Sequence, residues 1–140
     1  MKITFCGHKE VDDRVTVERW LHTVCADLIE HGADEFYLGG YGGFDHLYAD
    51  VLRNLKKSHP QIRLILVLPY LNSGMITDGY DETVYPPLES VPKRLVISRR
   101  NEWMVRESDT VVAYVTHGWG GAAKTLKYAC RKKKQVIIWL

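Results

Sequence analysis

Two glycine-rich segments carry the residue types best suited to holding a phosphate group. Residues 38–45 read Leu-Gly-Gly-Tyr-Gly-Gly-Phe-Asp, and residues 116–121 read Thr-His-Gly-Trp-Gly-Gly. Each segment follows a short apolar run and precedes a helical pattern, an order that brings bare backbone N–H groups and a helix N-terminus against an anion. Two such turns in one small chain predict a nucleotide or a phosphorylated sugar as the ligand.

Polar side chains follow the predicted strands, and turns that follow parallel strands share one rim of the sheet. An arginine fork suits phosphate oxygens, and a carboxylate such as Asp45 can accept hydrogen bonds from sugar hydroxyls. We therefore predict a ligand site at the carboxyl ends of the strands. Its predicted residues are Gly7, His8, Gly39, Gly40, Gly42, Gly43, Asp45, Arg99, Arg100, Asn101, Thr116, His117, Gly118, Trp119, Gly120, Gly121 and Thr125.

Each of these assignments has a structural alternative that the sequence leaves open. The glycines can form tight turns that only allow a helix to pack closely on a strand, and Asp45 can simply cap its helix. Arg99 and Arg100 can be solvated surface charges, and the loop histidines can be ordinary hydrogen-bonded residues. Trp119 differs, because it stands among glycines at the predicted rim, where its ring can stack on a base.

The elements that position these turns alternate between strands and helices. Strands are predicted at residues 2–6, 35–38, 62–68, 94–97, 110–115 and 135–140. Apolar residues at helical spacing predict helices at residues 14–31, 43–57, 99–107 and 121–133. This alternation predicts an α/β fold with a mainly parallel sheet and right-handed crossovers. We expect one Rossmann-like three-layer domain over residues 1–140.

Residues 70–92 interrupt this alternation. The segment contains Gly74, Gly79 and three prolines, together with three tyrosines. Loops of this length in a compact domain are usually functional or disordered. The segment is predicted to be a long loop with one helical turn, placed beside the glycine turns as a lid.

Composition limits the classes of protein to which the chain can belong. No apolar run approaches the roughly 20 residues that cross a bilayer, and the N-terminus lacks the pattern of a signal peptide. Cys6, Cys25 and Cys130 fit neither a zinc site nor a redox pair. We expect a cytoplasmic protein with free thiols, without a metal or cofactor and without membrane attachment.

The charge distribution leaves a role in nucleic-acid binding open. A net charge of +2 does not argue for such a partner, and the basic run at residues 131–134 also suits the C-terminal end of a helix. Lys124, Lys127 and Tyr128 can nevertheless join this run in a basic, aromatic groove for single-stranded DNA. A homodimer through an exposed apolar helix face is also compatible with the sequence.

Three ordered motifs resemble the SLOG superfamily. They are Gly39-Gly40-x-x-Gly43-x-Asp45, then Arg100-Asn101-x-x-Met104-x-x-x-Ser108-Asp109, then Gly118-x-Gly120-Gly121 with Thr125. The superfamily includes the LOG phosphoribohydrolases, the DprA-type DNA-processing proteins and the small bacterial YpsA-like proteins (DUF1273). The resemblance spans nearly the whole chain, and the Gly7-His8 turn is most similar to the YpsA-like branch.

The resemblance implies a Rossmann-like sheet and a nucleotide-derived ligand at the glycine rim. It also implies a catalytic role for Arg100 if the chain is a hydrolase. The LOG signature Pro-Gly-Gly-x-Gly-Thr-x-x-Glu is not kept, because Ala122 replaces its Thr and Thr125 replaces its Glu. A glycosidic hydrolase needs a carboxylate beside the developing oxocarbenium ion, and Asp45 is the remaining candidate.

Three functions follow from these observations. The first is a sensor-type module that binds a nucleotide or an ADP-ribose-like ligand. The second is a LOG-like hydrolase that cleaves the N-glycosidic bond of nucleoside 5'-monophosphates, with Arg100 and Asp45 as its catalytic groups. The third is a DprA-like protein that binds single-stranded DNA.

Overall fold

The computed structural model describes residues 1–140 and contains one six-stranded sheet. Neighbouring strands are parallel throughout, in the order β4-β3-β2-β1-β5-β6. This arrangement confirms the predicted Rossmann-like α/β fold. The strands are β1 (Lys2–Gly7), β2 (Glu35–Leu38), β3 (Arg63–Val67), β4 (Glu82–Val84), β5 (Thr110–Tyr114) and β6 (Gln135–Ile138).

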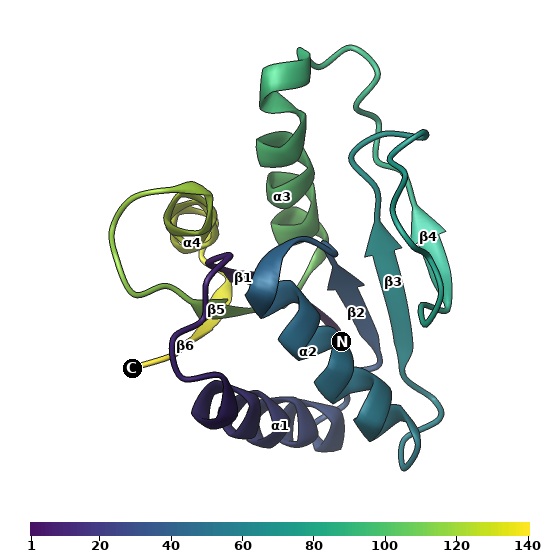
Figure 1. The fold of residues 1–140 in the computed structure, drawn as a ribbon, viewed down its shortest axis with the longest axis vertical. Coiled ribbons are helices and arrows are strands. Elements are labelled where there is room, and N and C mark those ends of the chain that lie inside the picture. Colours follow the sequence, from purple (N-terminus) through teal and green to yellow (C-terminus); the bar gives the residue numbers. More distant parts are fainter.

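Helices cover both faces of the sheet and give the molecule three layers. Figure 1 shows α1 (Arg14–Glu30) and α2 (Gly42–Lys56) together on one face, and α3 (Val96–Glu107) and α4 (Gly121–Arg131) on the other. Asp13 caps the start of α1, because its carboxylate accepts a hydrogen bond from the Thr16 N–H at 3.2 Å. None of the helices is long and apolar enough to cross a membrane.

Alternate residues of the central strands pack into cores on opposite faces of the sheet, which explains why the strand sequences are almost continuously apolar. In β2, Phe36 and Leu38 belong to the large core cluster beneath α1 and α2, whereas Tyr37 belongs to a smaller cluster with Met104 of α3. Successive side chains of a strand point to opposite faces of the sheet. Each central strand therefore needs apolar residues on both faces, because both are covered by helices.

The direction in which strands are added reverses between β1 and β5. From β1 the chain adds β2, β3 and β4 on one side, and it then returns through α3 to place β5 against the opposite side of β1. The loops that leave β1 and β5 therefore diverge above adjacent strand ends. A crevice forms at such a switch point, and ligands of open parallel sheets bind there.

The strand predicted at residues 94–97 is wrong, because these residues are helical. Residues Lys93–Leu95 form a 3₁₀ turn after Pro92, and α3 begins at Val96. The apolar run that ends at Ile97 resembles a strand in sequence, but Val96, Arg100 and Met104 are buried along one side of the helix. Because an arginine is buried on that side, the helical periodicity is not visible in the apolar residues alone.

The segment predicted as a loop over residues 70–92 contains the short edge strand β4. Its sequence, Glu-Thr-Val, has no recognisable alternation, so the strand depends on tertiary contacts. Asp81 accepts hydrogen bonds from the Leu64 N–H at 2.7 Å and from Lys56 Nζ at 3.1 Å. These two contacts align the segment beside β3, where its backbone completes the sheet.

Candidate functional site

A cavity of about 590 Å³, here called the rim cavity, opens at the carboxyl ends of β1 and β5. It lies where the order of the strands reverses, and four segments that are distant in sequence bound it. Most of the residues predicted to bind a ligand are brought together in its wall. They are Gly7, His8, Gly39, Asp45, Arg100, Asn101, Thr116, His117, Trp119, Gly120, Gly121 and Thr125.

The other predicted residues lie outside this wall: Gly40, Gly42, Gly43, Arg99 and Gly118. The exposed side chain of Arg99 faces Glu102 at 3.8 Å on the surface of α3. Gly42 and Gly43 lie beneath the loop that follows β1, because a Cβ on Gly43 would come within 2.5 Å of the Lys9 carbonyl oxygen.

The first glycine turn uses its backbone donors within the protein. Gly39 N–H donates to the Tyr48 hydroxyl at 3.0 Å, and Tyr41 N–H donates to Asp45 Oδ2 at 2.7 Å. Gly43 N–H donates to the Lys9 carbonyl at 2.7 Å. The turn therefore does not offer these three amides to a phosphate, and the charged group that it contributes to the rim cavity is the Asp45 carboxylate.

The second glycine turn leaves the amides at the start of α4 free. No side chain caps α4, and its first backbone hydrogen bond runs from the Lys124 N–H to the Gly120 carbonyl. The N–H groups of Gly121 and Ala122 therefore have no partner within the helix, and both residues line the rim cavity. This helix start combines free amides with the positive end of the helix dipole, as an anion site requires.

Arg100 is a fixed cation in the wall of the rim cavity. The residue is 3% exposed, and Nη1 donates to the carbonyls of Gly39 at 2.9 Å and Val67 at 3.1 Å. The guanidinium also lies 5.4 Å from the centre of the Tyr41 ring. Burial lowers the pKa of Arg100, yet a guanidinium stays charged in proteins. Nη2 makes no hydrogen bond within the protein and is available to an anion.

Asp45 faces Arg100 across Gly39. A Cβ placed on Gly39 would lie 3.1 Å from Asp45 Oδ2 and 3.2 Å from Arg100 Nη2, so a side chain here would crowd both charged groups. Burial raises the pKa of Asp45 to about 6, against the opposing effects of the Tyr41 N–H, Arg100 and the Tyr48 hydroxyl. The carboxyl group can therefore gain or lose a proton near neutral pH.

Three aromatic rings form a stack on the side of the rim cavity next to α4. His8 stacks on His117 at 3.8 Å, and His117 stacks on Trp119 at 3.8 Å, with interplanar angles of 15° and 20°. His8 Nε2 accepts a hydrogen bond from the Thr116 N–H at 3.0 Å. Burial, followed by the nearby His117, lowers the pKa of His8 and favours this neutral, accepting form.

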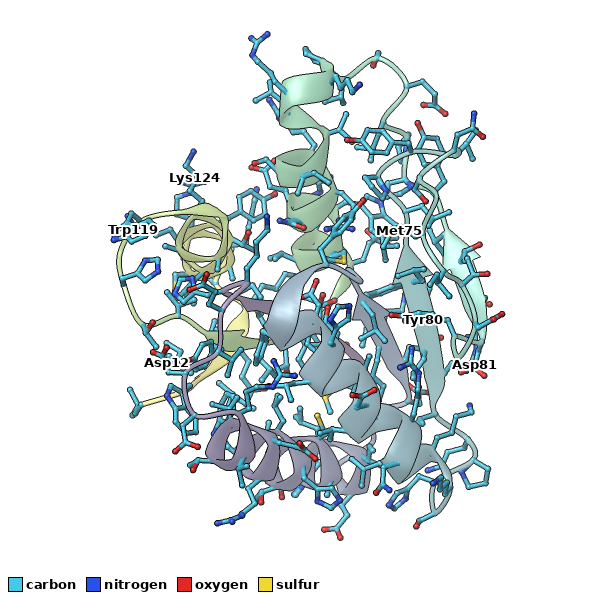
Figure 2. The ribbon with its side chains drawn as sticks, in the orientation of Figure 1. Asp12, Met75, Tyr80, Asp81, Trp119 and Lys124 are labelled. Atoms are coloured by element: carbon cyan, nitrogen blue, oxygen red, sulfur yellow. The ribbon has the colours of Figure 1, made fainter.

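Trp119 ends this stack with an open outer surface. It is 73% exposed, and Figure 2 shows it on the loop before α4, at the edge of the molecule. An exposed indole beside free amides is a suitable platform for a nucleobase. His117 Nδ1, beneath it, is the one buried side-chain nitrogen or oxygen atom without a hydrogen-bond partner.

Sequence reasoning misses several residues of the wall, among them Lys9, Tyr41 and Tyr48. Tyr48 lies on the apolar stripe of α2 and reads as a core residue, although its hydroxyl reaches the backbone of Gly39. Cys6 reads only as a free thiol, and burial raises its pKa to about 12. The full set of missed residues is Phe5, Cys6, Lys9, Glu10, Asp12, Tyr41, Tyr48, Ile97, Met104 and Ala122.

Comparison with curated proteins finds a relative in bacteria. No protein-family model matches the chain. A UPF0398 protein of Halalkalibacterium halodurans is 24% identical over an alignment of 120 residues that covers 77% of this chain. The match covers 64% of that protein, so this chain spans less than two thirds of its relative's length.

Solved structures share the fold at low sequence identity. DNA processing protein A from Helicobacter pylori has a TM-score of 0.66 at 15% identity, over 99% of this chain and 64% of that chain. The molybdenum cofactor carrier protein of Chlamydomonas reinhardtii has a TM-score of 0.63 at 20% identity, over 98% of this chain and 75% of that chain. In its motifs and its UPF0398 relative, the chain is similar to the YpsA-like branch of the SLOG superfamily, and its Rossmann-like fold is the one that these solved structures share.

Proposed function

We propose that the protein binds a nucleotide or a nucleotide-derived, ADP-ribose-like ligand in the rim cavity and acts as a sensor of that ligand. The observation that carries the proposal is the meeting of three features in one cavity. These are the uncapped start of α4, the buried cation Arg100 and the stack that ends at Trp119. A nucleotide presents a phosphate, a sugar and a base, and each has a complementary group here.

The proposed roles follow from the chemistry of each group. The N–H groups of Gly121 and Ala122, with Arg100 Nη2, bind the phosphate. Asp45 accepts hydrogen bonds from the sugar hydroxyls, and the base stacks on Trp119. The cavity of about 590 Å³ lies within the range of roughly 300–1,000 Å³ that ligand sites occupy.

A pair of variants at Gly121 tests the proposed phosphate site. Both Gly121→Pro and Gly121→Ala add a Cβ where no other atom lies within 4 Å, but only proline removes the N–H. Proline suits the first position of a helix, so the fold should tolerate it. Loss of one hydrogen bond to a charged group, worth about 1.5–3 kcal/mol, should weaken binding of Gly121→Pro about tenfold or more relative to Gly121→Ala.

Isothermal titration calorimetry with the four nucleoside 5'-monophosphates, ADP-ribose and inorganic phosphate measures this difference. Arg99→Ala provides a second control, because Arg99 lies outside the rim cavity. Equal affinities of the two Gly121 variants would exclude the start of α4 as the phosphate site. Absence of binding by every nucleotide at millimolar concentration would end the proposal.

A second candidate is hydrolysis of the N-glycosidic bond of nucleoside 5'-monophosphates. The observation that favours it is the Asp45 carboxyl group, whose pKa of about 6 suits proton transfer near neutral pH, opposite Arg100. Thr125 cannot replace a catalytic glutamate, and its hydroxyl donates to the Gly121 carbonyl at 2.9 Å. Release of free base by the wild type, abolished in Asp45→Asn, would support this candidate. Activity that survives Asp45→Asn would remove it.

Binding of single-stranded DNA is a third candidate, suggested by the neighbour whose single-stranded DNA binding mode has been described. Lys124, Lys127 and Arg131 line a cavity of about 200 Å³ between α3 and α4, and the Arg131 guanidinium lies 5.6 Å from the centre of the Tyr128 ring. Gel shifts of an oligonucleotide at several salt concentrations test it, because binding through phosphates must weaken steeply with salt. Salt-insensitive or absent shifts would count against it.

A further inference from the structure

A second cavity, of about 440 Å³, lies between α2 and the segment that joins β3 to β4. We call it the Tyr80 cavity. Tyr80 and Met75, both labelled in Figure 2, belong to this segment and form part of its wall. Gly40 is the one residue of the predicted ligand site that lines it, and the proposed function of the rim cavity does not use it.

Tyr41 lines both the rim cavity and the Tyr80 cavity. The residue is 39% exposed, and its ring lies against the Arg100 guanidinium, 5.4 Å from the charged carbon to the ring centre. A ligand that extends out of the rim cavity past Tyr41 therefore passes close to the buried cation. A negatively charged linkage at this crossing would be neutralised in part by Arg100.

Specific contacts hold the walls of the Tyr80 cavity in place. Gly40 has a φ of +79°, and a Cβ there would lie 2.5 Å from Met75 Cε, so the segment packs directly on the glycine turn. Arg53 Nε donates to the Gly79 carbonyl at 3.2 Å, and its guanidinium lies 5.0 Å from the centre of the Tyr80 ring. The cavity is thus bounded by residues from three segments whose relative positions are fixed by packing and hydrogen bonding.

The side chains of the Tyr80 cavity suit a second sugar-bearing group. The rings of Tyr41 and Tyr80 offer aromatic surface to a sugar or base, and Asp78 offers an acceptor for hydroxyls. Arg53 adds a cation on the α2 side. The mixture of aromatic, apolar and hydrogen-bonding groups differs from the amide-lined phosphate site, so the two cavities complement different parts of a molecule.

We propose that the natural ligand has two sugar-bearing halves joined by a pyrophosphate, with one half in the rim cavity and the other in the Tyr80 cavity. The pyrophosphate crosses Tyr41 beside Arg100. This inference rests on the proposed function of the rim cavity, and it narrows the ligand from any nucleotide to a nucleotide extended beyond its phosphates. ADP-ribose is the simplest available probe of that class.

Calorimetry with AMP, ADP and ADP-ribose measures the contribution of the second half. ADP-ribose should bind the wild type at least about tenfold more tightly than either AMP or ADP. The comparison with ADP separates the contribution of the second sugar to the affinity from that of the second phosphate. A short dinucleotide joined by a phosphodiester serves as the fourth probe and should bind no more tightly than AMP.

Two variants are designed to fill the Tyr80 cavity, one in α2 and one in the segment after β3, and a third is their control. Ser73→Trp and His46→Trp each introduce an indole at a residue that lines the cavity. Asn72→Trp introduces the same ring at an exposed residue that does not line it. Both filling variants should bind AMP as the wild type does and lose the tenfold preference for ADP-ribose. Asn72→Trp should keep that preference.

The outcomes separate this inference from the function on which it rests. If AMP binds, and ADP-ribose binds no more tightly than AMP or ADP, the two-part ligand is wrong and the proposed function stands. A preference for ADP-ribose that survives both filling variants also overturns the inference. Binding of the phosphodiester dinucleotide as tightly as ADP-ribose would assign the paired cavities to a nucleic-acid strand instead. If none of the four probes binds, the proposed function fails, and the inference fails with it.

Discussion

Arg100 has a structural role that is separable from ligand binding. It holds together the ends of β2 and β3, because Nη1 donates to the carbonyls of Gly39 and Val67, and these acceptors are buried with it. A sequence alone cannot show whether an arginine is solvated or buried, since the difference lies in which backbone carbonyls the fold brings within its reach. The residue is therefore both a charge for a ligand and a bridge between strands.

Replacement of Arg100 by methionine should destabilise the fold by about 2–4 kcal/mol, because two buried carbonyls lose their donor. Urea denaturation measures the change. Arg99→Met is the matched control, and it should alter the free energy of unfolding by no more than about 0.5 kcal/mol, since its side chain is on the surface. Equal midpoints for Arg100→Met and the wild type would show that the bridge is not structural.

Asp45 should make stability depend on pH in the acidic range. Its folded-state pKa of about 6 lies above its ordinary value of 3.8, so the folded protein binds this proton more tightly than the unfolded chain does. The stabilising contribution of the protonated carboxyl is therefore present below pH 3.8 and is lost as the pH rises to about 6.

Comparison of Asp45→Asn with the wild type isolates this contribution. The variant should become progressively more stable than the wild type as the pH rises from about 4 to about 6, and the difference should level off above that pH. Urea denaturation at a series of pH values measures it. The titration of His8 is common to both proteins and is removed by the subtraction. A difference that does not change with pH would show that Asp45 titrates normally.

At the scale of elements, the turn between β2 and α2 controls how closely the segment after β3 can approach the sheet. Gly40 has a positive φ and also has Met75 and Leu66 against it, whereas Gly74 has a positive φ and open space, with no atom within 4 Å of where a Cβ would lie. Comparison of alanine variants at the two glycines therefore separates the cost of backbone strain from the cost of steric crowding.

Gly74→Ala should cost about 1 kcal/mol, the penalty for a side chain in the left-handed region. Gly40→Ala should cost about 2–4 kcal/mol, because the added Cβ also displaces Met75 or strains its contact. Chemical denaturation measures both values. Because Gly40 also borders the Tyr80 cavity, crystallography of Gly40→Ala should show the segment displaced from the turn. Equal costs for the two variants would mean that the contact with Met75 is easily relieved.

At the scale of the whole molecule, the rim cavity joins segments that lie far apart in the sequence. His8 follows β1 and Thr116 follows β5, yet they are joined by a hydrogen bond because the two strands are neighbours. A ligand in the rim cavity would therefore restrain loops from both halves of the chain at once. The segments at the opposite end of the strands, such as the turn after α1, would have no contact with it.

Hydrogen exchange measured with and without ADP-ribose should show this pattern. At labelling times dominated by local opening, protection should increase over residues 7–12, 39–45 and 116–122, and should stay unchanged over residues 31–34. A ligand at about 100 times its Kd should also raise the free energy of unfolding by about 2.7 kcal/mol. Protection confined to α4 and its C-terminal basic residues would instead indicate a surface site on that helix.

Local patterns in the sequence are sufficient to predict most of the elements. The apolar strand at Arg63–Val67 and the amphipathic helix at Gly42–Lys56 agree with their predicted ranges to within a few residues. Prediction fails at Glu82–Val84, whose pairing depends on Asp81 reaching Leu64, and at the start of α3, where the buried Arg100 interrupts the apolar stripe. In both cases the deciding contact joins residues that the chain separates.

The α/β class, the two glycine turns and the superfamily resemblance can all be inferred without coordinates, because periodicity and glycine spacing are properties of neighbouring residues. Which of the two turns has free amides depends on how the chain folds. The loop at Lys9 covers Gly43 and takes up its N–H, whereas nothing caps the start of α4. A hydrogen-bond donor is available to a ligand only when no other part of the folded chain has already accepted its proton, and that depends on contacts between distant segments.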